Sequence, residues 1–158
     1  MREAREILGR RGIFLKPDMR HYAHTSRKVM ACLREFSPRV EVASIDEAFL
    51  DITHLAERHA REFELVAAHI QQNILTYTGV PISIGIAPTR LLAKTFAPLR
   101  KPLGVFAAFE LDEIVPTLNI MSLTQLPYVS HRSAARLHMC RTIGDFYRLS
   151  GHEIKQRL

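Results

Sequence analysis

Residues 39–53 read R-V-E-V-A-S-I-D-E-A-F-L-D-I-T, and the rest of the chain is arranged around this stretch. Apolar residues alternate with others on both sides of an acidic pair, Asp46 and Glu47, which is the period of a β-strand. Two such runs with a short connection predict an antiparallel hairpin. Because successive side chains at a turn or bulge can reach one point in space, the hairpin is expected to bring both carboxylates together.

The acidic pair is a candidate metal site. Magnesium takes a few carboxylates, keeps several waters and is completed by substrate phosphates, so Asp46 and Glu47 on a rigid hairpin beside a groove would suit it. The alternative is that both are solvated turn residues, because acidic residues are common in turns. For an Asp-Glu pair taken by itself, this second interpretation is the commoner one.

A longer string around the pair resembles a known signature. Residues 44–51, S-I-D-E-A-F-L-D, are similar to the signature of the Y-family (translesion) DNA polymerases. Residues 84–94, I-G-I-A-P-T-R-L-L-A-K, and residues 101–105, K-P-L-G-V, resemble the second palm block of that family. The resemblance therefore extends well beyond one motif.

Residues upstream of the hairpin point to one branch of the family. The patterns Y-x-x-x-S-x-x-V-M at 22–30 and L-x-x-x-S-P-R-V-E at 33–41 are most similar to the UmuC branch. The similarity covers most of residues 12–105 and is weaker afterwards. It implies a fragment that contains the palm after its first strand and the start of the thumb.

The resemblance also implies an activity and its partners. Family members carry out template-directed, magnesium-dependent nucleotidyl transfer in DNA repair and translesion synthesis, as part of the SOS response to damaged DNA. Asp46 and Glu47 would be catalytic ligands of Mg²⁺, and Arg90 would contact the triphosphate of the incoming nucleotide. Primer-template DNA and a deoxynucleoside triphosphate are the implied partners, with polymerase accessory subunits as further candidates. The residues expected to contact DNA are Lys94, Arg100, Lys101, Arg132 and Arg136.

The pattern around the hairpin predicts an α+β fold. Apolar residues at helical spacing predict one helix that starts at Pro17-Asp18 and ends before Pro38, and another over about 56–77. Alternation predicts strands in 80–87 and 104–109, and Ile13-Phe14-Leu15 is also strand-like. This order favours a mainly antiparallel palm sheet with helices on one face.

The last third of the chain predicts a second unit. Residues 1–112 are expected to form a partial palm, and residues 113–158 a small all-helical partial thumb with a degenerate helix-hairpin-helix. In the family such a turn carries Gly-x-Gly, where this chain has Tyr128-Val129-Ser130. Glycines there expose backbone N–H groups to a phosphate, and Tyr128 and Ser130 are not expected to follow the same positive-φ path.

Composition places the chain among ordinary globular proteins. Its 158 residues are 47% hydrophobic and 24% charged, and they hold no apolar run long enough to span a membrane. We therefore expect a cytoplasmic protein with no membrane partner. The net charge of +6, concentrated in both terminal parts, fits a polyanion partner, although solvated helix faces explain it equally well.

Two features of the family have no counterpart in this sequence. Family members supply a further catalytic Asp from a first palm strand, and a C-terminal domain that grips duplex DNA. We therefore expect the middle of a polymerase, inactive alone because the metal site lacks a third carboxylate. Two other hypotheses stay open: a non-catalytic remnant that binds DNA or a partner, and a small magnesium-dependent phosphohydrolase. The last would need another acid or a general base near the hairpin, and Asp51 is the nearest in sequence.

Overall fold

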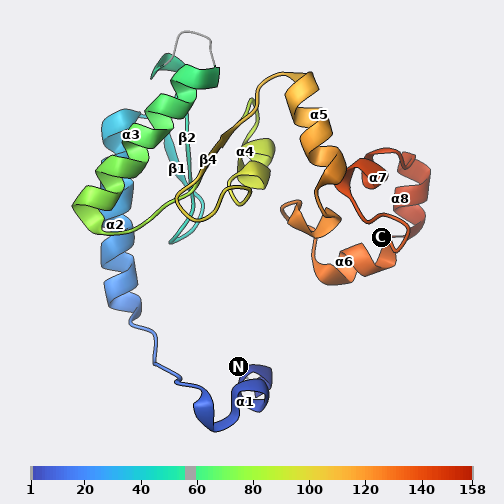
Figure 1. Ribbon diagram of the computed structural model, residues 1–158, viewed down its shortest axis with the longest axis horizontal. Coiled ribbons are helices and arrows are strands. Elements are labelled where there is room, and N and C mark those ends of the chain that lie inside the picture. Colours follow the sequence, from blue (N-terminus) through green and yellow to red (C-terminus); the bar gives the residue numbers. More distant parts are fainter. Residues whose placement is uncertain (1, 56–59, 158) are drawn as a thin grey trace.

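The computed structural model describes residues 2–55 and 60–157. Figure 1 shows α2, α3 and the strands gathered together, α5 to α8 forming a second group, and α1 set apart at the end of an extended segment. The described elements are α1 (Arg2–Leu8), α2 (Met19–Phe36), β1 (Val40–Val42), β2 (Ala48–Leu50), α3 (Ala60–Thr78), β3 (Ile84–Ile86), α4 (Arg90–Phe96), β4 (Val105–Ala107), α5 (Leu111–Ile120), α6 (His131–Arg136), α7 (Ile143–Tyr147) and α8 (Gly151–Arg157).

The predicted hairpin is confirmed. β1 and β2 are antiparallel, with Val40 opposite Leu50 and Val42 opposite Ala48. The tip spans residues 43–47, and the carbonyl oxygen of Glu47 accepts hydrogen bonds from the N–H groups of Ala43 and Ser44, at 3.0 and 3.1 Å. The acidic pair therefore lies at the tip of the hairpin.

The second pair of strands corrects the prediction of a mainly antiparallel sheet. β3 and β4 are parallel, with Ile84 opposite Val105. The strands are parallel because α4 lies between them in the chain. The connection through α4 brings the chain back to the end of the sheet at which β3 began, as parallel strands require. In the described part of the chain, the strands form two separate two-stranded sheets, one antiparallel and one parallel. The strands of the second pair are also shorter than the sequence pattern predicted.

Helices cover both faces of β3, not one face as predicted. Ile84 packs against the buried cluster of α2 and α3. Gly85 points the other way, since a Cβ added there would lie 2.1 Å from the carbonyl oxygen of Ala93 in α4. Because neighbouring residues of a strand face opposite sides, α4 lies on the side of β3 away from α3.

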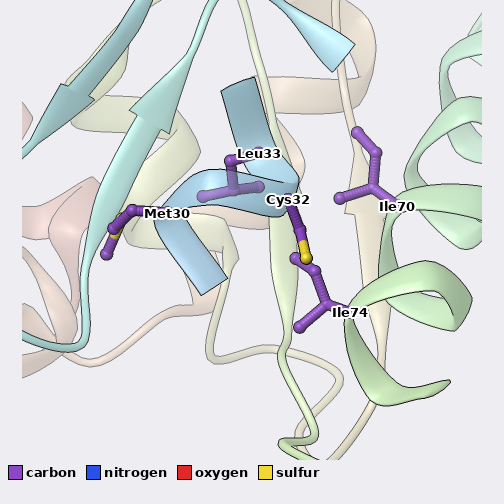
Figure 2. Packing of buried hydrophobic residues seen from close by; sticks show 5 residues of the cluster. All are labelled: Met30, Cys32, Leu33, Ile70 and Ile74. Carbon is purple, nitrogen blue, oxygen red and sulfur yellow. The ribbon is translucent and has the colours of Figure 1, made fainter. Parts of the chain in front are cut away.

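The first core joins the two long helices. Figure 2 shows side chains of α2 and α3 packed together, and this cluster also contacts Val40, Leu50 and Ile84 of the strands. Both predicted helices are confirmed, although residues 56–59 at the start of the second lie outside the described part. Asp18 caps α2 by accepting hydrogen bonds from the N–H groups of Arg20 and His21. The buried residues of this core are Met30, Cys32, Leu33, Ile70 and Ile74.

Two apolar expectations near the N-terminus are wrong. Ile13-Phe14-Leu15 has no strand partner among the described residues, and the side chains of Ile13 and Leu15 are 86% and 83% exposed. Tyr22 also shares the helical spacing of the apolar residues of α2, which predicts that it is buried. Its side chain is 49% exposed because it lies about two turns before Met30, the first buried residue of that helix. An apolar pattern only predicts burial where another element covers it.

The C-terminal part is helical, as predicted. Leu123, Leu137 and Cys140 form one buried cluster there. Another cluster joins Phe96 of α4 to Ile143 of α7, so it contains residues from both sides of the 112/113 boundary. The division into palm and thumb at that boundary stays a prediction.

The turn before α6 differs in part from expectation. Tyr128 has a φ of +71°, so this residue does adopt the positive-φ conformation that its side chain disfavours. Ser130 has a φ of −77° and caps α6, its hydroxyl accepting a hydrogen bond from the N–H of Ser133. Tyr128 therefore keeps the positive φ that a glycine would adopt, whereas Ser130 serves as the N-cap of α6. Within the described ranges, no helix is both long and apolar enough to cross a bilayer.

Candidate functional site

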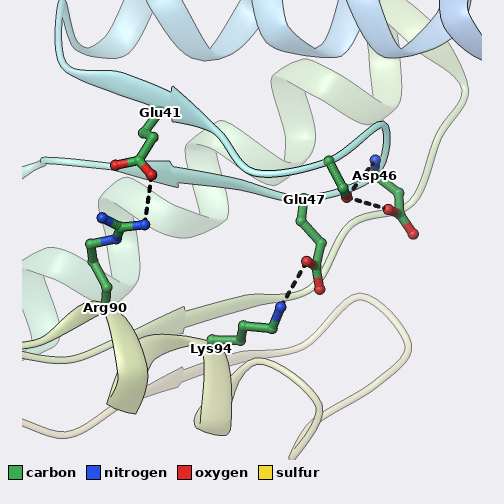
Figure 3. Close-up of polar contacts among 6 residues, drawn as sticks. Glu41, Asp46, Glu47, Arg90 and Lys94 are labelled. Atoms are coloured by element: carbon green, nitrogen blue, oxygen red, sulfur yellow. Dashed lines mark hydrogen bonds and ion pairs between the residues drawn. The ribbon is translucent and has the colours of Figure 1, made fainter. Parts of the chain in front are cut away.

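The hairpin and α4 face each other and build the site together. Thr89 caps α4 by accepting a hydrogen bond from the N–H of Leu92, so the helix begins directly after β3. Arg90 and Lys94 are four residues apart and therefore share one face of α4. Figure 3 shows both side chains reaching from α4 toward the hairpin. The site thus places two cations of α4 opposite Glu41 and Glu47 of the hairpin.

Glu47 is paired with Lys94. The Nζ of Lys94 donates a hydrogen bond of 2.8 Å to Oε2 of Glu47, and the two side chains are 30% and 47% exposed, respectively. This hydrogen bond raises the pKa of Lys94 above its ordinary value. The predicted metal ligand at Glu47 already has a protein cation as its partner.

Glu41 and Phe49 hold Arg90, and the sequence analysis missed both. Nη2 of Arg90 donates a hydrogen bond of 2.6 Å to Oε1 of Glu41, and its guanidinium lies 4.5 Å from the centre of the Phe49 ring. Glu41 and Phe49 are directly opposite in the hairpin, so their side chains share one face. The sequence could have revealed this pair, because the register of the predicted hairpin places Glu41 opposite Phe49.

Asp46 has a different partner from Glu47. The Ser44 hydroxyl donates a hydrogen bond of 2.6 Å to Oδ1 of Asp46, and the Asp46 N–H donates one of 3.3 Å back to that hydroxyl. Figure 3 shows Glu47 directed at α4 while Asp46 turns toward the end of the loop. For Asp46 and Glu47 to bind the same cation, both side chains would have to move from their present contacts with Ser44 and Lys94.

The donor set at the tip matches Mg²⁺ in kind. Asp46 and Glu47 are exposed hard-oxygen donors that border a groove, which is the type of ligand that Mg²⁺ takes alongside substrate phosphates. Across residues 2–55 and 60–157, no group of three or more His, Cys, Asp or Glu side chains is placed to hold a metal ion. The described residues thus supply two protein ligands to such a site.

Asp51 lies at the other end of the hairpin. Its N–H donates a hydrogen bond to the carbonyl oxygen of Arg39, and Nη1 of Arg39 donates one of 3.0 Å to Oδ2 of Asp51. Hydrogen bonds from Thr53, together with the one from Arg39, lower the pKa of Asp51 to about 2. Asp51 therefore stabilises the base of the hairpin and is not a third acid at its tip.

We expect the charge of Asp51 to make stability depend on pH. Its pKa is lowered by folding from about 3.9 to about 2, so its contribution is fully present above about pH 4 and is lost as the pH falls through about 2. Asp51→Asn should make the thermal midpoint vary less between pH 5 and pH 2 than in the wild type. Circular dichroism melts at four pH values would measure it.

Part of the pH dependence should survive in that variant. Hydrogen bonds from Phe109 and Thr142, respectively, lower the pKa values of Glu113 and Asp145, and these bonds are unchanged by Asp51→Asn. Arg39→Met removes one partner of Asp51 and should give an intermediate profile. Identical profiles for the wild type and Asp51→Asn would contradict the role of this carboxylate.

The remaining basic candidates occupy different places. Arg100 donates a hydrogen bond of 3.3 Å to the carbonyl oxygen of Val105 and packs over Phe106, so it supports β4. Lys101 is exposed at the edge of the groove, beyond the end of α4. Arg132 and Arg136 are exposed on α6. Contact of these residues with DNA stays a prediction.

One large groove connects the parts of the site. It has a volume of about 2620 Å³ and is lined by the hairpin, β3, α4 and residues 124–129. Tyr128, 87% exposed, borders it, and Nζ of Lys94 lies 5.5 Å from the centre of the Tyr128 ring. The C-terminal segment thus reaches the tip of the hairpin through Lys94.

Comparison with known proteins gives a consistent result. Residues 1–97 match the sequence profile of the IMS (impB/mucB/samB) family, further upstream than residue 12, where the resemblance seen in the sequence began. DNA polymerase IV of Oceanobacillus iheyensis is 34% identical over 148 residues, which are 92% of this chain and 35% of the relative. DNA polymerase IV of Saccharolobus solfataricus is 34% identical over 119 residues, 74% of this chain and 33% of the relative.

Solved structures are similar over nearly the whole chain. The crystal structure of DinB from Sulfolobus solfataricus has a TM-score of 0.86 at 27% identity and covers 98% of this chain and 46% of that one. The insertion ternary complex of Dbh DNA polymerase has a TM-score of 0.84 at 28% identity, with 98% and 45% covered. The present chain thus spans about a third of the curated relatives and under half of the solved chains.

Proposed function

Because this chain belongs to the impB/mucB/samB family, the Y-family DNA polymerases, we propose that it forms the palm and thumb parts of a translesion DNA polymerase. Its substrates would be primer-template DNA and a deoxynucleoside triphosphate. The observation that carries the proposal is the hairpin beside the groove, where Glu41 and Glu47 pair with Arg90 and Lys94 of α4 and Asp46 adjoins Glu47 at the tip. This arrangement suits chemistry on a phosphate chain.

Each residue of the site has a proposed task. Asp46 and Glu47 would hold Mg²⁺, which when bound neutralises charge on a transferring phosphoryl group. Arg90 would bind the triphosphate of the nucleotide, and its contact with Phe49 fixes the plane of the guanidinium for that purpose. Lys101, Arg132 and Arg136 would bind the DNA backbone, which needs only exposed positive charge.

The branch within the family is also a proposal. The patterns at 22–30 and 33–41 suggest the UmuC-like branch. The relatives reported above are named DNA polymerase IV, and one of them aligns with 92% of this chain. The longer alignment carries more weight than two short patterns, so we favour a DNA polymerase IV-like chain.

We expect the 158-residue chain by itself to make no primer-extension product. Two carboxylates, one of them paired with Lys94, are too few protein ligands to hold the two ions of a phosphoryl-transfer site. Extension of a labelled primer with Mg²⁺ or Mn²⁺ should give no more product than the Asp46→Ala control. Extension that depends on Asp46 would show that two ligands suffice.

DNA binding tests the proposed function more directly. We expect weak, sequence-independent binding, with a Kd at the weak end of the non-specific range of about 10⁻⁴ to 10⁻⁶ M. Because counterion release drives it, affinity should fall steeply between 50 and 200 mM salt. Fluorescence anisotropy with a labelled duplex at several salt concentrations would measure both quantities.

A matched pair of variants locates the binding surface. Lys101→Ala removes a cation at the edge of the groove, and Arg61→Ala removes one from the exposed start of α3. Only the first should weaken binding and reduce its salt dependence. Equal effects of both would place the DNA elsewhere, and no binding at all would reject the proposed function.

A non-catalytic DNA-binding remnant is the second candidate. It is favoured by the pairing of both cations of α4 with acids of the hairpin, which leaves each charge compensated inside the protein. This candidate and the first both predict DNA binding. They differ in that only a polymerase part should gain Asp46-dependent extension when combined with the remaining parts of a relative.

A further inference from the structure

The side of α2 that turns away from the strands carries basic residues that the site does not use. Met30 and Leu33 of this helix are buried in the first core, whereas the opposite side of the helix is exposed. Residues seven apart in a helix lie nearly above one another, about 10.5 Å apart along the axis. The exposed basic residues on this side, called here the basic face of α2, are Arg20, Arg27, Lys28 and Arg34. The three arginines are spaced by seven residues and therefore form one row.

The charges of the basic face are not compensated within the chain. Across residues 2–55 and 60–157, none of these four side chains forms an ion pair with an acidic side chain. Glu35 is the acid that adjoins the row, at its C-terminal end. Arg90 and Lys94 of α4, by contrast, each pair with a glutamate of the hairpin. The basic face therefore presents an excess of positive charge to solvent.

The basic face and the groove lie on different sides of α2. Tyr22, Ser26 and Val29 are among the residues of this helix that line the groove, and no residue of the basic face lines it. Figure 1 shows the first part of α2 extending beyond the end of α3, and Tyr22 in that part is 49% exposed. A ligand on the basic face would therefore not occupy the groove.

The composition of this surface favours a nucleic acid over a protein. Protein interfaces depend on apolar or aromatic anchors near their centre, and the exposed residues between the cations are Ala23, His24 and Ala31. Binding to a nucleic acid backbone needs only positive charge, because the release of counterions drives it. Single strands stack their bases on aromatic side chains, and the basic face has no Phe, Tyr or Trp. Duplex DNA is therefore the ligand whose chemistry fits.

We propose that the basic face of α2 binds the backbone of duplex DNA, at a second surface that is separate from the groove and does not read sequence. The row from Arg20 to Arg34 is about 21 Å long, and four phosphate contacts along it would give a salt slope of about −3.6. This surface would hold the chain on duplex DNA outside the groove. The inference goes beyond the proposed function, because the basic face can bind DNA whether or not the groove does.

Photo-cross-linking measures the occupancy of the basic face by itself. Ala31 is exposed and lies between Arg27 and Arg34, so Ala31→Cys places a photoactivatable maleimide label within the proposed surface. Cys32 and Cys140 are buried, which directs the label to the introduced thiol. The yield of cross-links to a short labelled duplex, measured against the duplex concentration, gives the Kd of this surface at each salt concentration.

Two double variants of the labelled chain test the role of the arginines. Arg27→Gln with Arg34→Gln should weaken binding at least about tenfold at 0.1 M salt and lower the salt slope by about 2, one for each lost phosphate contact. Arg11→Gln with Arg61→Gln is the matched control, since it removes the same charge from exposed positions elsewhere. It should change the slope by less than about 1. Circular dichroism melts of each variant confirm that the compared chains are folded.

Two further controls locate the bound duplex. Lys101→Ala acts at the edge of the groove and should leave cross-linking from position 31 unchanged. A label at Ile120→Cys, on a side chain of α5 that is 81% exposed, should give little cross-linked DNA. Cross-linking from Ile120→Cys as efficient as that from Ala31→Cys would mean that the duplex contacts the chain without a preferred surface.

Other outcomes would also overturn the proposal. Equal effects of the two double variants would show that net charge alone governs binding. A loss of cross-linking from position 31 in Lys101→Ala would show one duplex that spans the groove and α2. If labelled polyglutamate, but not DNA, binds the wild type more tightly than the Arg27 and Arg34 double variant, the surface binds acidic proteins instead.

The same experiments separate this inference from the proposed function. If Lys101→Ala changes neither cross-linking from position 31 nor the total binding seen by anisotropy, the groove does not bind DNA and the basic face does. If Lys101→Ala lowers total binding but Ala31→Cys gives no cross-link, the proposed function survives and the second surface is rejected. Absence of any DNA binding rejects both.

Discussion

Gly85→Ala should lower the free energy of unfolding of this chain by about 3 kcal/mol, at the upper end of the usual cost of overpacking a core. A Cβ at this position would lie 2.1 Å from the carbonyl oxygen of Ala93 and 2.5 Å from the backbone nitrogen of Ala97. Both contacts are to backbone, which cannot move aside as a flexible side chain does. The helix α4 would have to shift away from β3, and Arg90 and Lys94 would shift with it.

Gly151→Ala is the matched control for that variant. A Cβ at Gly151 would meet no atom within 4 Å, so the same chemical change should alter stability by less than about 0.5 kcal/mol. Urea denaturation followed by circular dichroism would measure both variants against the wild type. A loss in Gly85→Ala no larger than that in Gly151→Ala would mean that α4 does not pack on β3 as described.

A strand supplied in trans should stabilise the chain. In the described part, the sheet is divided into two pairs of strands, and residues of both pairs line the groove. Leu50 of the hairpin and Ile82 before β3 are among them. Unpaired strand edges beside apolar side chains recruit another strand. We therefore expect an N-terminal segment of a family member, which carries the first palm strand, to bind there.

The expected effect of that segment is large. At a concentration about 100 times its Kd, binding would add about 2.7 kcal/mol, which corresponds to a rise of about 5–10 °C in Tm for a chain of this size. Without it, we expect self-association. Co-expression of the chain with the segment, followed by measurement of soluble yield, Tm and mass by light scattering, would test both expectations.

The surface that drives self-association differs from the sequence-based expectation. A sheet without the first palm strand predicts that Val29, Met30 and Leu33 of α2 are uncovered, but Met30 and Leu33 are only 6% and 9% exposed because α3 covers them. Ile13 and Leu15 are instead among the most exposed large apolar side chains, at 86% and 83%. Exposed apolar surface favours association.

Suitable variants separate these two sources of self-association. Ile13→Ser combined with Leu15→Ser should reduce association without raising Tm, because it removes apolar surface but pairs no strand edge. A version of the added segment with proline in its strand is the control for pairing, since proline cannot donate to the ladder. A cooperative, monomeric chain that gains nothing from the unmodified segment would show that no strand is lacking from the sheet.

Local pattern was sufficient for the elements that depend on neighbours in the chain. The alternation around Asp46 and Glu47 predicted the hairpin and placed the acids at its tip, because a two-residue period needs no information from elsewhere. Asp18 marked the start of α2, because a cap is made with N–H groups two or three residues away. The polymerase family was recognisable for a similar reason, since its signature is contiguous.

Features that join distant segments were decided only by the tertiary structure. The pairing of Glu47 with Lys94 crosses 47 residues, and nothing near either side chain in the sequence selects that partner over another. The parallel course of β3 and β4 follows from where α4 packs, and that packing needs Gly85 because two backbones meet there. Tyr128 keeps a positive φ although its own side chain opposes it, because its preference is worth less than the tertiary contacts that hold the turn.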